Sequence, residues 1–260
     1  MTLPNYKEQG TGDTAVFVLH GVGGGHQAWA QTLPVLASQG YRAIAWDAPG
    51  YGGSPAVDPY TTFELARALL KLVAYVGARR NVVLGHSMGG MVAQEAFAVD
   101  PHAIHGLTLF ATSPAFGKPG GDWQQQFLQS RFAPLDAGAG MAGLAPDLVR
   151  RMFAPGASNA DMAAAVAMMS RVPETTYRAA LSAIVSFNRL DNLPNINVPT
   201  LCLACELDKN AAPAVMEKMA AHIAGAEYAC LPRVSHLGNM EQPEAFNAAV
   251  LKFLKQHFPT

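Results

Sequence analysis

The sequence predicts an α/β fold, with a doubly wound, mostly parallel sheet, helices on both faces of the sheet and one helical insertion. Short apolar runs such as AVFVLH at 15–20 and NVVLGH at 81–86 are typical of buried parallel strands. They alternate with segments in which apolar residues recur at helical spacing. The alternation stops between about Ser113 and Asn195, where the segments have helical patterns only.

The expected elements follow in chain order from these patterns. Strands are predicted at 15–20, 42–47, 81–86, 107–110, 199–204 and 228–231. Helices that cover the sheet are predicted at about 26–38, 62–76, 88–99, 213–223 and 243–257. The interrupting stretch carries further helices, at about 123–132, 144–153, 160–171 and 174–188.

Turn-forming residues mark both ends of the interrupting stretch. They are Pro114, Gly117, Pro119, Gly120 and Gly121 on one side and Pro194 and Pro199 on the other. We therefore expect a core domain made of residues 1–112 and 196–260, and a helical cap, or lid, at 113–195.

Composition limits the classes of function. The chain has 260 residues, of which 50% are hydrophobic and 14% charged, which is the profile of one large folded domain. A formal net charge of −1, with no long Lys or Arg run, gives no reason to expect nucleic acid or an anionic membrane as partner. The N-terminus lacks the pattern of a signal peptide, and no apolar run approaches the roughly 20 residues that span a bilayer. A cytoplasmic protein is expected.

The cysteines indicate neither a disulfide framework nor a metal site. Cys202, Cys205 and Cys230 are too few for such a framework and are expected to be buried thiols. Cys202 and Cys205 are three residues apart on a predicted strand, so their side chains point to opposite faces, and no second pair completes a zinc site. We expect no metal and no cofactor.

The candidate nucleophile is Ser87, in the stretch VVLGHSMGGMVAQEAF that runs from a predicted strand into a predicted helix. Gly85 and Gly89, two residues to either side, match the pattern G-x-S-x-G, in which small residues let a strand and a helix meet in a tight, strained turn. Such a turn exposes the serine hydroxyl at the carboxyl edge of the sheet, where open α/β folds bind their ligands.

A serine hydroxyl needs a base to activate it and an acid to orient that base. His236, in a loop just after the last predicted strand, lies at the same sheet edge and is the expected base. Asp208, in the loop after the preceding strand, is the expected acid, with Glu206 as its rival two residues earlier. The predicted catalytic residues are thus Ser87, Asp208 and His236.

The attack of a hydroxyl on a carbonyl creates an oxyanion that needs hydrogen-bond donors. One expected donor is the backbone N–H of Met88, at the start of the helix after Ser87. The other is the backbone N–H of Val22, in the glycine-rich stretch HGVGGGHQAW. This stretch lacks the Gly-Lys-Ser/Thr ending of a phosphate loop and does not fit the dinucleotide-binding pattern.

Taken together, these segments resemble the α/β-hydrolase fold superfamily, over nearly the whole chain. The resemblance rests on HG-x-G-G-G near the start, WDAPGYGGS at 46–54, GHSMGG at 85–90, SHLGNMEQPEAF at 235–246, and the order serine, aspartate, histidine. It implies that the insertion at 113–195 is a cap over the active site. Haloalkane dehalogenases and epoxide hydrolases of this superfamily carry aspartate at the elbow, so Ser87 argues against both.

Among members with a serine nucleophile, the compact size of the chain and its GHSMGG elbow resemble small carboxylesterases and the 3-oxoadipate enol-lactonase group. The resemblance implies a cofactor-free serine hydrolase that cleaves small carboxylic esters or lactones with water through an acyl-enzyme intermediate. Carbon–carbon hydrolases of meta-cleavage products share the D-x-P-G-x-G-x-S segment but usually carry asparagine before the serine, where this chain has His86. That activity, and cofactor-independent perhydrolysis or dioxygenation on the same fold, stay open as alternatives. The oligomeric state is not predicted.

The predicted cap is rich in methionine and aromatic residues, a few of which are expected to line an apolar substrate pocket. Trp123, Phe127 and Met168 are the candidates. The cap arginines are Arg131, Arg150, Arg151, Arg171, Arg178 and Arg189. One of them could hold a substrate carboxylate, but nearby acids nearly balance them and leave a solvated charged face as the simpler interpretation.

Overall fold

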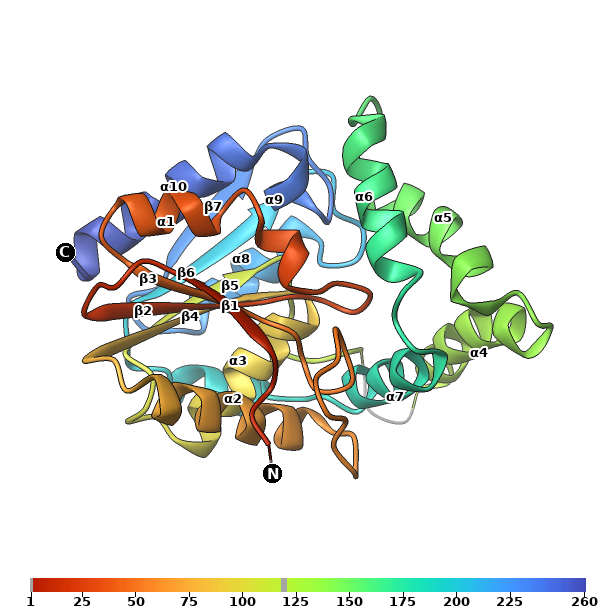
Figure 1. The fold of residues 1–260 in the computed structure, drawn as a ribbon, viewed down its shortest axis with the longest axis horizontal. Coiled ribbons are helices and arrows are strands. Elements are labelled where there is room, and N and C mark those ends of the chain that lie inside the picture. The colour runs from red at the N-terminus through yellow and green to blue at the C-terminus, as the bar shows by residue number, and fades with distance from the viewer. Residues whose placement is uncertain (1, 118–120) are drawn as a thin grey trace.

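The computed structural model describes residues 2–117 and 121–260 (Figure 1). The predicted turn residues Pro119 and Gly120 lie outside the described residues. The sheet consists of β1 (Tyr6–Gln9), β2 (Thr14–Leu19), β3 (Arg42–Trp46), β4 (Arg80–His86), β5 (Gly106–Phe110), β6 (Thr200–Cys205) and β7 (Glu227–Leu231), in the order β1-β3-β2-β4-β5-β6-β7. All neighbouring pairs are parallel except β1 with β3. The predicted fold class is confirmed.

The order of the strands places a switch point between β2 and β4. The chain moves from β2 outward to β3, and then returns to β4 on the other side of β2 before it continues to β5. The loops after β2 and β4 therefore leave the sheet side by side and diverge to opposite faces. Open α/β sheets bind their ligands in the crevice that this divergence creates.

Strand β1 was not predicted. Its residues, Tyr-Lys-Glu-Gln, form no apolar run, and three of them are exposed because β1 pairs on one side only. A short, charged edge strand is a common way to prevent further strand pairing. Such a strand has no hydrophobic pattern from which it could be predicted.

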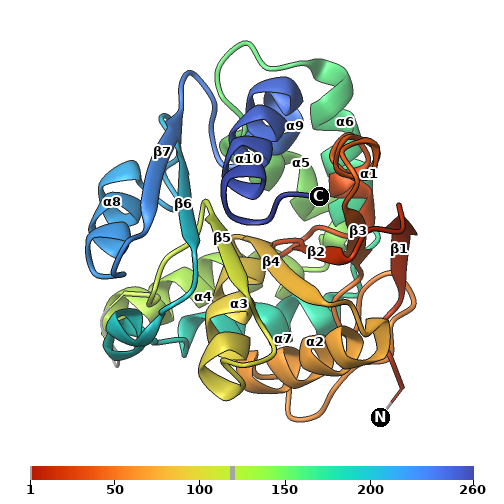
Figure 2. The same cartoon turned by 90° about the vertical axis from the view of Figure 1, so that its left-hand side faces the viewer.

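Helices cover both faces of the sheet. The helices α1 (Leu33–Ser38) and α10 (Pro243–His257) pack on one face, where Leu36 and Phe253 join a buried cluster with Val16 of β2. The helices α2 (Thr62–Val76), α3 (Met88–Val99) and α8 (Pro213–Ala221) pack on the other face. Figure 2 shows α10 on one side of the twisted sheet and α2 and α3 on the other. Because successive strand residues point to opposite faces, the strands β2 to β6 each contribute to both clusters.

The prediction of one continuous helix at 26–38 is wrong. The structure has a 3-10 turn, η1 (His26–Trp29), followed by the separate helix α1, whose first turn contains Pro34. Proline has no N–H to donate to the preceding turn, so it starts a helix more readily than it continues one. The short helix α9 (Gly238–Glu241) was also not predicted.

The described residues between β5 and β6 form four α-helices, and we call this segment, residues 113–195, the helical insertion. It contains α4 (Asp122–Asp136), α5 (Gly140–Met152), α6 (Asn159–Met169) and α7 (Glu174–Val185), followed by the 3-10 turn η2 (Leu190–Asn195). These helices gather at one end of the molecule, beside the sheet rather than on its faces (Figure 1). Helix α4 extends beyond its predicted range, 123–132, at both ends, and α5 begins four residues before its predicted start at 144.

The two ends of the helical insertion are joined to each other. The amide of Phe116 donates to the carbonyl oxygen of Phe187 over 3.1 Å, and the amide of Arg189 donates to that of Pro114 over 2.7 Å. Arg189 also forms an ion pair with the buried Glu95 of α3. The insertion thus leaves and re-enters the sheet at one place. Its boundary as a separate cap domain stays a prediction.

The cysteines depart from expectation at one position. Cys202 and Cys205 are fully buried and belong to the clusters on opposite faces of the sheet, as predicted. Cys230 is exposed, so the expectation that it is buried is wrong. It lies on the edge strand β7, where burial alternates along the strand and only one face packs on the core.

Within the described part of the chain, no helix has the length and apolar character needed to span a membrane.

A buried histidine ties the loop after β2 to the end of β3. The ring of His20 is completely buried, with Nδ1 2.8 Å from the carbonyl oxygen of Gly21 and Nε2 2.9 Å from the amide nitrogen of Ala48. Because the carbonyl accepts and the amide donates, the ring must carry its proton on Nδ1 and leave Nε2 unprotonated. Burial lowers the pKa of His20 to about 4.

This histidine makes the stability of the fold depend on pH. As the pH falls from about 6.5 to about 4, the unfolded chain binds a proton at His20 that the folded chain does not, so about 1.4 kcal/mol of stability is lost per pH unit. We expect His20→Asn to be less stable than the wild type at pH 7, and to lose about 2 kcal/mol less than the wild type between pH 7 and pH 4.5. Urea unfolding at both pH values measures this difference.

The control is His102→Asn, since His102 is exposed. It should lose as much stability as the wild type between the two pH values. Equal losses in His20→Asn and His102→Asn would contradict the assignment.

Candidate active site

Ser87 occupies a strained turn between β4 and α3. Its backbone has φ 53° and ψ −117°, a conformation that residues other than glycine adopt rarely. Only this residue separates the last residue of β4, His86, from the first residue of α3, Met88. The turn therefore lies at the carboxyl end of β4, at the switch point of the sheet.

The glycines around Ser87 are required by close contacts. A Cβ atom on Gly85 would collide with the carbonyl oxygen of Gly89, and one on Gly89 would collide with the carbonyl oxygen of Leu19 in β2. A Cβ on Gly90 would approach the side chain of Thr112 to 2.6 Å. The strand and the helix thus meet at a separation that only glycine allows, as the G-x-S-x-G pattern predicts.

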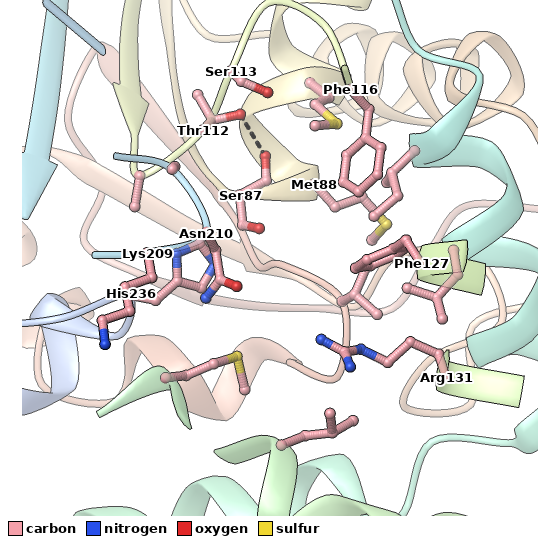
Figure 3. A pocket seen from close by; sticks show the side chains of 18 of the residues that line it. Ser87, Met88, Thr112, Ser113, Phe116, Phe127, Arg131, Lys209, Asn210 and His236 are labelled. Atoms are coloured by element: carbon pink, nitrogen blue, oxygen red, sulfur yellow. Dashed lines mark hydrogen bonds between the residues drawn. The ribbon is translucent and has the colours of Figure 1, made fainter. Parts of the chain in front are cut away.

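Ser87 opens into a cavity of about 330 Å³ between the strand ends and the helical insertion. His236, Val22 and Met88 line the same cavity, so it brings together Ser87 and three other residues predicted for catalysis or for the oxyanion hole. In Figure 3 the Ser87 hydroxyl and the His236 ring face the same space, and no hydrogen bond joins them. In an empty active site the bond between nucleophile and base is often long and shortens only when substrate binds.

Asp208 lies directly behind His236. Its Oδ2 is 2.7 Å from His236 Nδ1, and its Oδ1 accepts hydrogen bonds from the amides of Asn210, at 2.7 Å, and Ala211, at 3.1 Å. Burial raises the pKa of Asp208, but the charge and hydrogen bond of His236 and the two amides outweigh burial and hold the pKa below its ordinary value. Asp208 is therefore ionised at neutral pH.

The rival acid, Glu206, is placed elsewhere. Its side chain is exposed, and its Oε2 accepts a hydrogen bond from the amide of Arg233 over 2.7 Å. His236 is thus bonded to Asp208 and not to Glu206.

Two residues that line the cavity have a backbone N–H group with no acceptor among the described residues. Val22 follows β2 and Met88 begins α3, and neither N–H donates a hydrogen bond to any described residue. The first amides of a helix have no partner within the helix, and its dipole favours negative charge at this end. Both amides are available to an anionic oxygen beside Ser87.

Two residues that hold the backbone around His236, His86 and Glu241, were not among the predicted site residues. His86 Nε2 donates to the carbonyl oxygen of His236 over 2.8 Å, and burial, followed by the nearby His236, lowers the pKa of His86 to about 3. Glu241 accepts hydrogen bonds from the amide of Ser235 and from the amide of Ala154 in the helical insertion, each at 2.8 Å. Burial raises the pKa of Glu241. Neither role has a local sequence signal, because each depends on segments distant along the chain.

The predicted substrate contacts divide between two hollows. Trp123 and Phe127 line the cavity of about 330 Å³ beside Ser87, which we call the main cavity. Met168 instead lines an adjacent, smaller cavity that Ser87 and His236 also border. Among the cap arginines, Arg150, Arg178 and Arg189 pair with acids, while Arg131 and Arg151 line the main cavity.

In residues 2–117 and 121–260, no group of three or more His, Cys, Asp or Glu side chains is arranged to hold a metal ion.

Known proteins with the same fold cover nearly the whole chain. BpoC of Mycobacterium tuberculosis, a protein named as a non-heme bromoperoxidase, is 30% identical over 95% of this chain and 96% of its own length. A thermophilic esterase of Thermogutta terrifontis, solved with malate bound, is 25% identical with a TM-score of 0.88, covering 97% of this chain and 93% of its own. The enol-lactonase of Burkholderia xenovorans LB400 is 25% identical with a TM-score of 0.85, covering 96% of each chain.

The family model that describes the alpha/beta hydrolase family matches residues 15–249, which include every strand except β1 and all the predicted site residues. The chain therefore belongs to the alpha/beta hydrolase family.

Proposed function

We propose that this protein is a serine hydrolase that cleaves small carboxylic esters or lactones through an acyl-enzyme intermediate, without a cofactor. The observation that carries the proposal is the arrangement around one cavity: Ser87 on a strained elbow, and His236 with its Nδ1 bonded to the buried Asp208. The sequence similarity to an esterase and an enol-lactonase supports acyl transfer to water as the reaction class.

In the proposed mechanism His236 Nε2 takes the proton of Ser87 as Oγ attacks the carbonyl carbon of the substrate. Asp208 holds the imidazole in the required tautomer and stabilises its positive charge. The amides of Val22 and Met88 stabilise the oxyanion. His236 then protonates the leaving oxygen, and the acyl group stays on Ser87. A water molecule, activated by the same histidine, attacks the acyl-enzyme, releases the acid and restores the Ser87 hydroxyl.

We also propose that the helical insertion, residues 113–195, acts as a cap. Trp123, Phe127 and Met152 of its helices line the cavity that Ser87 opens into, so they would contact the substrate. A mostly apolar wall favours the uncharged body of an ester or lactone over bulk water.

Ser87→Ala and His236→Ala should each reduce the hydrolysis of an activated ester such as p-nitrophenyl butyrate by about 10³-fold or more, because triad members act as a unit. A fluorophosphonate should add its mass to the Ser87 peptide of the wild type and to neither variant. Thermal unfolding is the control and should stay close to that of the wild type. Retained turnover in either folded variant, or labelling at another residue, would reject the assignment of the nucleophile and base.

Asp208→Asn and Glu206→Gln form a matched pair that tests the orienting acid. Asp208→Asn should lower kcat by about 10²- to 10⁴-fold, because an amide no longer fixes the imidazole tautomer. Glu206→Gln should change kcat by less than about threefold, because this exposed side chain contacts only the backbone of Arg233. Steady-state kinetics on one ester measures both. The reverse ranking would move the acid to Glu206.

The reaction class is tested by a panel of substrates at equal concentrations. We expect kcat/KM to be highest for a short-chain ester or a five-membered enol-lactone, and to be lower for a vinylogous 1,5-diketone of the meta-cleavage type. A preference for the diketone by about a hundredfold or more would indicate carbon–carbon hydrolysis instead.

The similarity to BpoC makes halide oxidation the second activity to measure. Bromination of monochlorodimedone with hydrogen peroxide and an organic acid should be slower than ester hydrolysis by the same preparation. Faster bromination that disappears in Ser87→Ala would establish perhydrolysis as the principal activity.

A further inference from the structure

The arginine and lysine side chains that line the main cavity give it positive charge only. Its walls are largely apolar, but Arg131, Arg151 and Lys209 also line it. No aspartate or glutamate of the described residues does so. Clefts with low-dielectric walls and charges of a single sign concentrate ligands of the opposite charge. The cavity is therefore electrostatically suited to an anionic ligand, which its role in ester hydrolysis alone does not require.

Arg131 is the cation best placed to contact such a ligand. It extends from α4, is partly buried, and its guanidinium lies 5.1 Å from the centre of the Phe127 ring. Figure 3 shows the guanidinium pointing into the cavity that Ser87 and His236 face. Contact with an aromatic ring restricts the guanidinium and removes part of its water, which prepares it to bind an anion.

Arg131 has no carboxylate partner within the part of the chain that the structure describes. The contrast with Arg178 is informative, because Arg178 also lies against an aromatic ring, Phe132, yet pairs with Asp136 and Glu174. A guanidinium recognises carboxylates through two parallel N–H donors in a planar fork. The guanidinium of Arg131 thus points into the cavity, and none of its donors is bonded to a carboxylate of the described residues.

Lys209 and Arg151 are less directly placed. Both side chains are exposed at the border of the cavity, and Lys209 lies beside His236 in Figure 3. Exposed cations of this kind raise the local concentration of anions more than they fix their position. They would attract the ligand, whereas Arg131 would hold it.

We infer that the preferred substrate is an ester or lactone that carries a second, free carboxylate, and that Arg131 binds this carboxylate while the scissile carbonyl lies at Ser87. The inference rests on the proposed hydrolase function. It adds a specificity-determining residue and a substrate class: half-esters of dicarboxylic acids, or lactones with a carboxylate side chain. The apolar walls formed by Phe127, Leu181 and Ile184 suit the carbon chain between the two groups.

The test compares two substrates of the same shape and different charge. They are the monophenyl ester of adipic acid and the phenyl ester of adipic acid monoamide, in which a neutral carboxamide replaces the carboxylate. Release of phenol gives kcat/KM for each. The wild type should prefer the half-ester by about tenfold or more, because hydrogen bonds to charged groups are the stronger ones.

Arg131→Gln should lower this preference by about tenfold, and Arg131→Lys, which keeps the charge but not the fork, should lower it less. Arg150→Gln is the matched control: it removes an arginine from the neighbouring helix α5 that is 75% exposed and does not line the cavity. It should keep the preference of the wild type. An equal preference in the wild type and in folded Arg131→Gln would overturn the inference.

A binding measurement separates this inference from the proposed hydrolysis. Adipate is titrated calorimetrically into Ser87→Ala and into the double variant Ser87→Ala/Arg131→Gln. We expect binding to the first and binding at least about tenfold weaker to the second. If neither phenyl ester is hydrolysed but Arg131 still governs adipate affinity, the proposed hydrolase function fails and the carboxylate site stands. If both esters are hydrolysed through Ser87 but adipate binds the two variants equally, only the carboxylate site fails.

Discussion

The contact between the start of α3 and the ends of β2 and β4 is the constraint on which the rest of the site depends. Gly89 lies against the carbonyl oxygen of Leu19, and no side chain fits between them. To turn from strand to helix in so little space, the chain places Ser87 at a positive φ that it would not adopt alone. The surrounding packing maintains this strain. As a result, Ser87 and Met88, which are adjacent in the chain, both line the cavity.

A second constraint is the burial of the charge on Asp208. A carboxylate removed from water is strongly destabilising unless hydrogen bonds replace its hydration. Asp208 receives two backbone amides on one oxygen and the His236 ring on the other. His236 is held in turn by His86 at its carbonyl oxygen, and Glu241 fixes the amide of the preceding residue. The imidazole is thus positioned through several contacts, each of which satisfies a buried polar group.

Residues of the core and residues of the helical insertion both line the main cavity. The sheet supplies the groups that would carry out the chemistry, while the helical insertion supplies most of the apolar wall and the guanidinium of Arg131. Glu241 connects the two, because one carboxylate accepts from Ser235 beside the histidine and from Ala154 in the insertion. The residues proposed for chemistry and those proposed for substrate preference are therefore separate in sequence but adjacent in space, and such a division lets one fold support many functions.

Much of the fold, and the placement of Ser87, Asp208 and His236 at one edge of the sheet, could be predicted from the sequence alone. Strand and helix periods, the glycines around Ser87 and the positions of Asp208 and His236 after two strands are local features, and parallel strands bring their carboxyl ends to one edge. The polar edge strand β1, the break before Pro34 and the exposure of Cys230 were not predictable in this way, because they depend on which neighbours a segment acquires.

Tertiary structure alone decided which charged side chains reach the cavity and which are paired elsewhere. The sequence left six cap arginines equivalent and Glu206 as a rival to Asp208. Packing paired three of those arginines with acids, directed Arg131 into the cavity, and turned Glu206 towards the backbone of Arg233. The physical reason is that ion pairs and hydrogen bonds form between groups a few ångströms apart in space, and the distance between two residues along the chain does not determine that separation.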